Sequence, residues 1–268
     1  MALTHPFTGG EPQRVNKWLA QAGVCSRREA EALIAAGRVK IDGEPVADPG
    51  RKIAPGQTLT IDAAGAGALA AKLSVVIHKP VGFVSAHAEG DQINAVRLLR
   101  RAALAGPKPP VWPNADHRLA PVGRLDQDSR GLLILSEDGV LAKAVIGPES
   151  PIDKEYVVRV WGELTERKLS WLRHGLSLDG KPLRPAIVEA LDRQTLRFVL
   201  TEGRNRQIRR MCELVELEVA DLLRTRIGPI HLGDLGAGRW RTLAPDERAA
   251  LIASAQAPRT GTGVRSRL

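Results

Sequence analysis

A loop that leads into a buried strand carries the first candidate for chemistry, the carboxylate of Asp126. Residues 132–135 form a continuous apolar run, which is typical of a strand buried on both faces. Asp126 precedes this run and lies between Arg124 and Arg130 in the sequence. Because nearby positive charge favours the ionised form of a carboxyl group, Asp126 is better suited to act as a nucleophile than as a general acid. The alternative is a turn residue that bonds to its own backbone.

Four ordered segments of the chain carry distinctive motifs. They are a Lys-Pro-x-Gly motif at 79–82, residues 123–139 (GRLDQDSRGLLILSEDG), a Lys-Glu-Tyr motif at 154–156 and an arginine-rich motif at 203–211. Together they resemble the motifs of bacterial pseudouridine synthases that modify small- and large-subunit ribosomal RNA, in which the motif like 123–139 carries the catalytic aspartate. Four ordered matches over about 140 residues are far more specific than one short motif. The resemblance implies an enzyme that isomerises uridine to pseudouridine.

The resemblance also implies roles for individual residues. Asp126 corresponds to the catalytic aspartate, Tyr156 to the tyrosine that stacks on the flipped uracil and relays a proton, and Arg209 to the arginine that pairs with the aspartate. A core aromatic is the alternative for Tyr156, the only tyrosine of the chain, and an ion pair elsewhere is the alternative for Arg209. The remaining expected substrate contacts are Arg124, which helps to hold the space vacated in the RNA, Ile208 under the base, Arg206 and Arg210 on phosphates, and Lys79.

For Lys79 a purely structural role is as plausible as a contact with RNA, because Lys-Pro-x-Gly ends a strand and can simply turn the chain.

The implied reaction breaks one glycosidic bond and forms another without redox change, so it requires no cofactor. Its target base must first be flipped out of the RNA, at a cost of a few kcal/mol. The carboxylate would attack the ribose or the uracil ring, or assist formation of a glycal, and the sequence leaves these routes open.

The composition favours a polyanionic partner and excludes several other classes. The net charge is +9 and the isoelectric point is near 10.1, with basic residues in excess over 97–130 and 204–241. No apolar run approaches the roughly 20 residues that span a bilayer, and the N-terminus lacks the apolar core of a signal peptide. Two distant cysteines and dispersed histidines indicate neither a disulfide nor a metal site. We therefore expect a cytoplasmic, monomeric protein that does not bind membranes or metals.

The first domain is expected at 14–62. Apolar spacing predicts a helix at 15–22, a capping box predicts a second helix from Ser26, and 39–46 has the pattern of a hairpin. This helix, helix, hairpin order resembles the small RNA-binding domain named after the fourth small-subunit ribosomal protein. Four basic residues of this domain are expected to contact RNA phosphates: Arg27, Arg28, Arg38 and Lys40.

A flexible linker at 63–71 and a catalytic domain at 72–256 are expected to follow. The small, uncharged residues of 63–71 favour the linker. The catalytic domain has the pattern of an α+β fold, a largely antiparallel mixed sheet with helices. Its strands are predicted at 74–78, 82–86, 132–135, 156–161, 186–190, 195–201 and 220–227, and its helices at 140–146, 166–174, 206–215 and 245–254. Residues 87–121 are a long connection that suits RNA recognition, and 1–13 and 257–268 are expected to be disordered tails.

The favoured function is pseudouridine formation in ribosomal RNA, with the large subunit as the expected source. A noncatalytic RNA-binding or ribosome-assembly protein is an alternative, but it would not need Asp126, Tyr156 and Arg209 together. A transfer RNA pseudouridine synthase is a second alternative. A methyltransferase would require a glycine-rich nucleotide turn after a strand, and the Gly-x-Gly sequences at 65–67, 236–238 and 261–263 fall in the expected linker, a loop and a tail.

Overall fold

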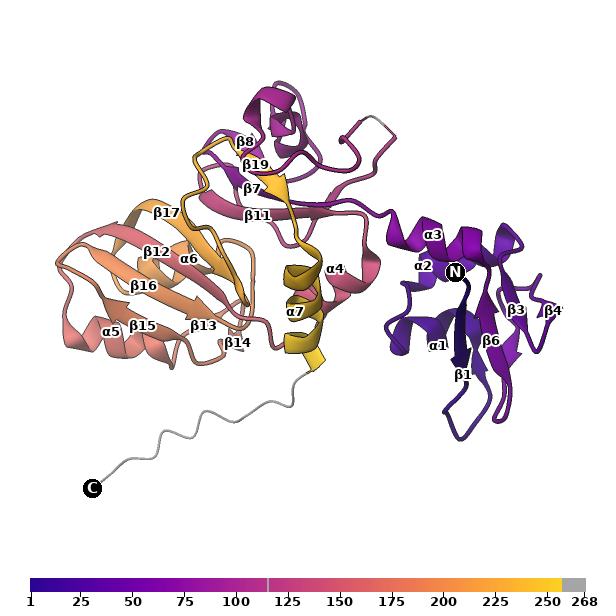
Figure 1. The fold of residues 1–268 in the computed structure, drawn as a ribbon. Helices are drawn as coiled ribbons and strands as arrows, with labels where there is room; N and C mark the ends of the chain where they lie inside the picture. Colours follow the sequence, from indigo (N-terminus) through magenta and orange to yellow (C-terminus); the bar gives the residue numbers. More distant parts are fainter. Residues whose placement is uncertain (115, 257–268) are drawn as a thin grey trace. The chain divides into compact units, whose positions relative to one another are not determined.

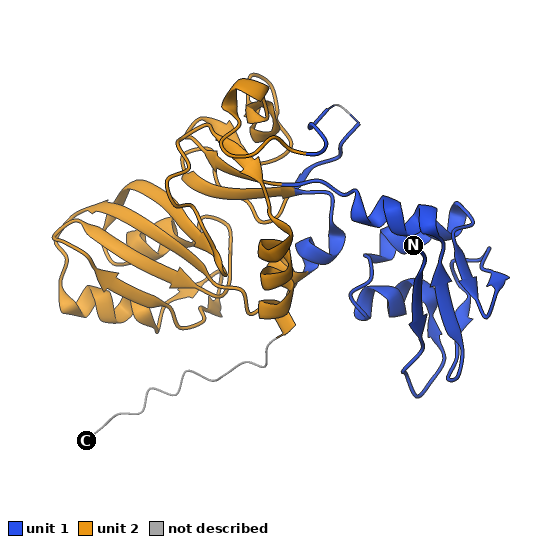
Figure 2. Ribbon diagram, viewed as in Figure 1, with its two compact units in different colours: residues 1–74, 110–120, 136–143 blue, residues 75–109, 121–135, 144–268 orange. Residues whose placement is uncertain are grey.

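The computed structural model describes residues 1–114 and 116–256, which fall into two compact units. Figure 2 colours the first unit blue: Met1–Ser74, Pro110–Ala120 and Ser136–Lys143. The second unit consists of Val75–Pro109, Pro121–Leu135 and the described residues from Ala144 onward. The tail predicted at 257–268 lies outside the described residues.

The first unit has the predicted helix, helix, hairpin order. Helix α1 (Val15–Gln21) is followed by α2 (Arg27–Ala35), which begins with the predicted capping box of Ser26 and Glu29. A four-stranded sheet follows the order β1 (Leu3–Pro6), β6 (Thr58–Ile61), β3 (Val39–Ile41) and β4 (Glu44–Pro45), and β2 (Gln13–Arg14) pairs with β5 (Lys52–Ile53). The core contains Val15, Leu19, Ile34, Val39 and Leu59, all almost fully buried.

Two predictions for this unit are wrong. Strand β1 lies within the expected N-terminal tail and pairs antiparallel with β6 along its whole length, from Leu3 opposite Ile61 to Pro6 opposite Thr58. The expected flexible linker is helix α3 (Ala63–Ala70). Asp62 caps this helix by accepting a hydrogen bond from the backbone N–H of Gly65 at 2.7 Å. Alanine has the highest intrinsic helix propensity, so the alanines of the segment favour the capped helix.

The second unit is built on a mixed, mostly antiparallel sheet, as predicted. The strands follow the order β15 (Ile187–Ala190), β16 (Thr195–Leu200), β12 (Lys154–Trp161), β17 (Glu218–Ile227), β11 (Arg130–Ser136), β7 (Ser74–Lys79) and β19 (Trp240–Thr242). The β11–β17 pair is parallel, and the β12–β16, β12–β17 and β15–β16 pairs are antiparallel. Strand β18 (Ile230–His231) pairs with β17, and β10 (Ala120–Pro121) pairs with β11.

Helices accompany the sheet near their predicted positions (Figure 1). Helix α5 (Glu166–Arg173) packs against β15, and α6 (Gln207–Leu214) packs against β17. The other helices are α4 (Gly139–Ile146) and α7 (Pro245–Gln256), and the hairpin of β13 (Ser177–Leu178) and β14 (Lys181–Pro182) lies between α5 and β15 in the sequence. Alternating side chains of β12 and β16 are buried, as in Val158, Val160 and Phe198, so the sheet presents an apolar face to its core.

The long connection predicted at 87–121 contains ordered structure. Within it, strand β9 (Ile93–Asn94) pairs in parallel with β8 (Phe83–Val84), which precedes the connection, and the short 3₁₀ helices η1 (Ala95–Leu98) and η2 (Arg101–Ala103) follow. Trp240 anchors them, because its indole N–H donates to the carbonyl of Arg100 at 2.8 Å. In the part of the chain that the structure describes, no helix is both long and apolar enough to cross a bilayer.

Candidate active site

The loop that carries Asp126 is held by hydrogen bonds on both sides of this residue. The hydroxyl of Ser85, which is buried, accepts from the backbone N–H of Leu125 at 2.9 Å and donates to its carbonyl at 2.6 Å. The backbone N–H of Gly82 donates to the carbonyl of Gln127 at 2.8 Å. The backbone around Asp126 is therefore fixed, while its carboxylate stays about one third exposed.

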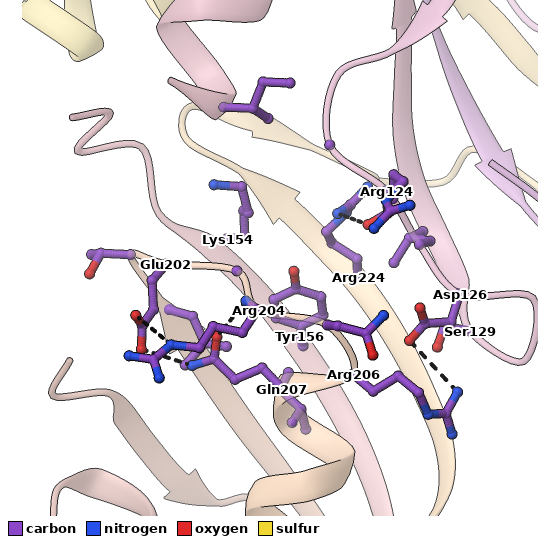
Figure 3. A pocket seen from close by; sticks show the side chains of 18 of the residues that line it. Arg124, Asp126, Ser129, Lys154, Tyr156, Glu202, Arg204, Arg206, Gln207 and Arg224 are labelled. Atoms are coloured by element: carbon purple, nitrogen blue, oxygen red, sulfur yellow. Dashed lines mark hydrogen bonds and ion pairs between the residues drawn. The ribbon is translucent and has the colours of Figure 1, made fainter. Parts of the chain in front are cut away.

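A pocket of about 380 Å³ opens beside Asp126, and all of its walls belong to the second unit. Four separate stretches line it, within 123–129, 145–156, 184–209 and 222–224. Figure 3 shows Asp126 and Tyr156 in the same pocket, with arginine side chains around them. The predicted residues that line the pocket are Arg124, Asp126, Tyr156, Arg206, Ile208 and Arg209.

Strand β12 places Tyr156 in the pocket. Tyr156 lies opposite Phe198 of β16 and Arg224 of β17, and its side chain is 9% exposed. Ile208, at the start of α6, is also buried and lines the same pocket. An aromatic ring and a branched aliphatic side chain form apolar surfaces on which a flat base can stack.

Arg209 does not pair with Asp126, contrary to the prediction. Its Nη2 lies 3.2 Å from a carboxylate oxygen of Asp128 and donates to the carbonyl of Asp128 at 2.9 Å and to the hydroxyl of Ser129 at 3.3 Å. Arg206 lies nearer the predicted nucleophile, with Nη1 3.9 Å from an Asp126 carboxylate oxygen and 3.1 Å from Asp128. The left-handed backbone of Arg206 (φ 48°) precedes α6 and is not evident from the motif.

Lys79 has a structural position and does not line the pocket. Its side chain is fully buried, and Nζ donates to the carbonyls of Pro80 at 3.0 Å and Phe83 at 2.8 Å. Burial lowers the pKa of Lys79 to about 8, and the negative charges of Asp126 and Asp128 partly oppose this change. Of the two interpretations of the Lys-Pro-x-Gly motif, the structure favours the turn of the chain over a substrate contact.

The other predicted residues are distributed between the pocket and the surface. Arg124 is exposed at the pocket, whereas Arg210 pairs with the Asp179 carboxylate through bonds of 2.6 and 3.0 Å. In the first unit Arg27, Arg28, Arg38 and Lys40 are all exposed, as phosphate contacts require. Arg38 also pairs with Asp62 at 3.2 Å.

Four cationic residues that line the pocket were missed from the sequence: Lys154, Arg184, Arg204 and Arg224. Lys154 donates to the carbonyl of Ile152 at 3.0 Å, and burial, followed by the charge of Arg224, lowers its pKa to about 8. Arg224 is 1% exposed and lies in the buried part of β17. The sequence did contain a signal for Arg224, which follows two leucines within a predicted strand. Among the described residues, no group of three or more His, Cys, Asp and Glu side chains could hold a metal ion.

A partly exposed carboxylate in an arginine-lined pocket, in a chain whose first unit exposes basic side chains, fits an enzyme that acts on RNA. Comparisons with known proteins agree with this class. Residues 73–214 match the family model described as RNA pseudouridylate synthase, and residues 13–59 match the S4 domain. The chain belongs to the RNA pseudouridylate synthase family and carries an S4 domain at its N-terminal side.

The similarity to known relatives extends over most of the chain. The chain is 33% identical over 236 residues to the dual-specificity RNA pseudouridine synthase RluF of Escherichia coli (strain K12), which covers 87% of this chain and 76% of the relative. It is 34% identical over 241 residues to the ribosomal large subunit pseudouridine synthase B of Bacillus subtilis (strain 168), with coverages of 88% and 93%. A crystal structure of a pseudouridylate synthase superposes with a TM-score of 0.61 at 25% identity, covering 89% of this chain and 99% of that one.

Proposed function

We propose that this protein isomerises a specific uridine to pseudouridine in ribosomal RNA of the large subunit. The observation that carries the proposal is that Asp126 and Tyr156, from two different motifs of the family, line one pocket. The choice of the large subunit is supported by the similarity to the Bacillus subtilis ribosomal large subunit pseudouridine synthase B. We further propose that the protein acts as a monomer in the cytoplasm, where ribosomal RNA is available to a single RNA-binding chain.

The geometry supports a reaction in which the target base is flipped into the pocket. Tyr156 and Ile208 supply surfaces for the base, and Asp126 attacks the ribose or the uracil ring, or assists glycal formation. The N1–C1′ bond breaks, the base rotates, and C5 forms the new bond to C1′. The proton released from C5 is replaced in the product by a proton on N1, so no outside reactant is consumed. Tyr156 is positioned to accept or relay the C5 proton.

The guanidinium of Arg206 is positioned to orient the nucleophile. Its Nη1 lies 3.9 Å from the Asp126 carboxylate and 3.1 Å from that of Asp128, so one cation bridges the two acids. Arg209 fixes the next part of the same loop through Asp128 and Ser129. In this arrangement Arg209 acts on the nucleophile through the loop backbone, and Arg206 acts on it directly.

The test is carbodiimide-coupled primer extension across ribosomal RNA from cells that lack this protein, complemented with defined variants. We expect Asp126→Asn to abolish the modification, because an amide of the same size cannot act as the nucleophile. The loss of activity in vitro should be on the order of 10⁴-fold or more. Asp179→Asn is the matched control, since Asp179 pairs with Arg210 outside the pocket.

Each other outcome of this experiment has a distinct meaning. A modification that survives Asp126→Asn would overturn the assignment of the nucleophile. Stops that are unchanged in ribosomal RNA but altered in transfer RNA would replace the proposed substrate. RNA binding by a wild-type protein that modifies no RNA would favour the noncatalytic, ribosome-assembly alternative.

A further inference from the structure

A buried arginine with an unused donor lies in the wall of the pocket. Arg224 is 1% exposed, and arginines are almost never fully buried unless they are paired. Its Nε donates to the carbonyl of Leu132 at 2.7 Å, and its Nη1 donates to the carbonyl of Arg124 at 3.2 Å. Its Nη2 is also buried and has no hydrogen-bond partner among the described residues.

The unused donor of Arg224 requires an acceptor that the protein does not supply. A buried N–H that loses water without gaining another acceptor is costly in free energy. The two bonds to backbone carbonyls fix the guanidinium plane, so Nη2 cannot reach a different partner without breaking them. Arg224 lines the pocket and lies opposite Tyr156 in the β12–β17 register (Figure 3). An acceptor within the pocket is therefore the simplest partner for Nη2.

The depth of Arg224 distinguishes a base from a phosphate as its partner. Arg124 is exposed and the Arg206 side chain is 43% exposed, so these two arginines can meet the RNA backbone at the surface. A flipped base enters the pocket further than the phosphates, which remain part of the strand. Uracil presents two carbonyl oxygens, and both are hydrogen-bond acceptors.

We propose that Nη2 of Arg224 donates a hydrogen bond to a carbonyl oxygen of the flipped uracil. This inference rests on the proposed function, and it makes Arg224 a substrate-recognition residue of the same pocket. The bond would replace the missing partner of Nη2 at the moment of base entry. It would also select for a base that places an acceptor, and not an amino group, toward β17.

The experiment uses three RNA stem-loops that differ only at the target nucleotide, which is uridine, 2-thiouridine or 4-thiouridine. Sulfur is a weaker acceptor than oxygen, so the substitution at the contacted position should lower kcat/KM of the wild type by about tenfold. The Arg224→Lys variant should convert the uridine substrate more slowly than the wild type does. In this variant the uridine substrate and the thio substrate at the contacted position should have the same kcat/KM. Arg226→Lys is the matched control, since Arg226 lies on the same strand but pairs with Asp153 outside the pocket.

The thio substrates also separate recognition from folding and from catalysis. The loss of kcat/KM on the thio substrate is measured with the wild-type protein. It therefore tests the contact even if a thermal unfolding control shows that Arg224→Lys does not fold. Kd values of the three RNAs for the Asp126→Asn variant give the same comparison between oxygen and sulfur without turnover. A wild type that reacts equally with all three RNAs, or a penalty that persists in Arg224→Lys, would overturn the contact. A wild type that is inactive on every RNA would instead overturn the proposed function.

Discussion

Ser85 positions the predicted nucleophile without reaching it. One hydroxyl group bonds to both the N–H and the carbonyl of Leu125, the residue before Asp126. Because Ser85 is buried, water cannot substitute freely for these two bonds. The orientation of the Asp126 carboxylate therefore depends on a side chain from a segment forty residues earlier in the sequence.

We expect Ser85→Ala to lower kcat by about 10- to 100-fold while changing KM little. A shift of the nucleophile by a fraction of an ångström impairs the reaction more than it impairs binding. Single-turnover and steady-state rates on the ribosomal RNA substrate measure this split. Ser170→Ala on the exposed face of α5 is the control. An unchanged kcat in a folded Ser85→Ala protein would contradict the positioning role.

Lys79 should make stability depend on alkaline pH. Its pKa is about 8 in the folded chain and near the ordinary value of 10.5 in the unfolded chain. Between these values the unfolded chain binds more protons at this residue, so the free energy of unfolding should rise with pH from about 8 to about 10.5. Below about pH 8 both states are protonated, and Lys79 contributes no slope.

Urea denaturation at several pH values compares the wild type with Lys79→Met. As pH rises from about 8 to about 10.5, the free energy of unfolding of the wild type should increase relative to that of Lys79→Met. Lys154, whose pKa is also about 8, is present in both proteins and cancels from the comparison. Lys17→Met removes an exposed lysine and should follow the wild-type slope. Parallel curves for Lys79→Met and wild type would contradict the shifted pKa.

Motifs predicted which side chains share the pocket better than they predicted the contacts among them. Tyr156 and Ile208 lie in the pocket with Asp126, because each motif fixes a residue on a regular element near its end. The partner of Arg209 could not be predicted, since it depends on the left-handed turn at Arg206 and on the path of the loop at Asp128. The sequence identifies the groups, whereas the tertiary structure decides their pairing.

At the level of elements, α3 shows how tightly one helix packs. A Cβ atom on Gly65 would lie 2.7 Å from Cγ2 of Ile61 and 3.1 Å from side-chain atoms of Leu33 and Arg38. A Cβ atom on Gly67, two residues further along the same helix, would meet nothing within 4 Å. The two glycines therefore differ in packing while sharing a helical backbone.

We expect Gly65→Ala to destabilise the protein by about 1–3 kcal/mol through overpacking. Gly67→Ala should stabilise it by about 0.5–1 kcal/mol, because alanine is the better helix former in an open position. Chemical denaturation of both variants measures the pair under one set of conditions. Equal effects of the same sign would contradict the packing of α3 against Leu33 and Ile61.

Regular elements were predictable where local periodicity determined them. Strands β12 and β16 and helices α5 and α6 lie near their predicted positions. Apolar residues recur in their sequences at every second position in the strands and every third or fourth position in the helices, and this spacing predicts which side chains are buried. Strand β1 was missed because it depends on its pairing with β6, more than fifty residues away, and not on its own pattern. Helix α3 was missed because small residues without polar periodicity suit a linker and a helix alike.

At the scale of the whole molecule, the S4 domain should contribute charge to RNA binding. Arg28 is exposed in the first turn of α2 and free to contact a phosphate. We expect Arg28→Ala to weaken RNA binding and to reduce the slope of log K against log salt by about 1, as for one phosphate contact. Fluorescence anisotropy over a salt series measures the slope.

Arg193→Ala is the matched control for this measurement. Arg193 is exposed between β15 and β16, and its removal lowers the net charge by the same amount. Its slope should stay close to that of the wild type. Identical slopes for Arg28→Ala and Arg193→Ala would show that binding follows overall charge and not a specific basic face.

The pairing of β11 with β17 has a consequence for folding. The bond from Nη1 of Arg224 to the carbonyl of Arg124 joins residues 100 positions apart, and Gly131 lies directly opposite Arg224. Non-local contacts of this kind close late and slow the folding of a chain. During translation Asp126 leaves the ribosome long before Arg224 does. We expect a nascent chain to carry its nucleophile without a closed pocket, so that catalysis begins only after the sheet is complete.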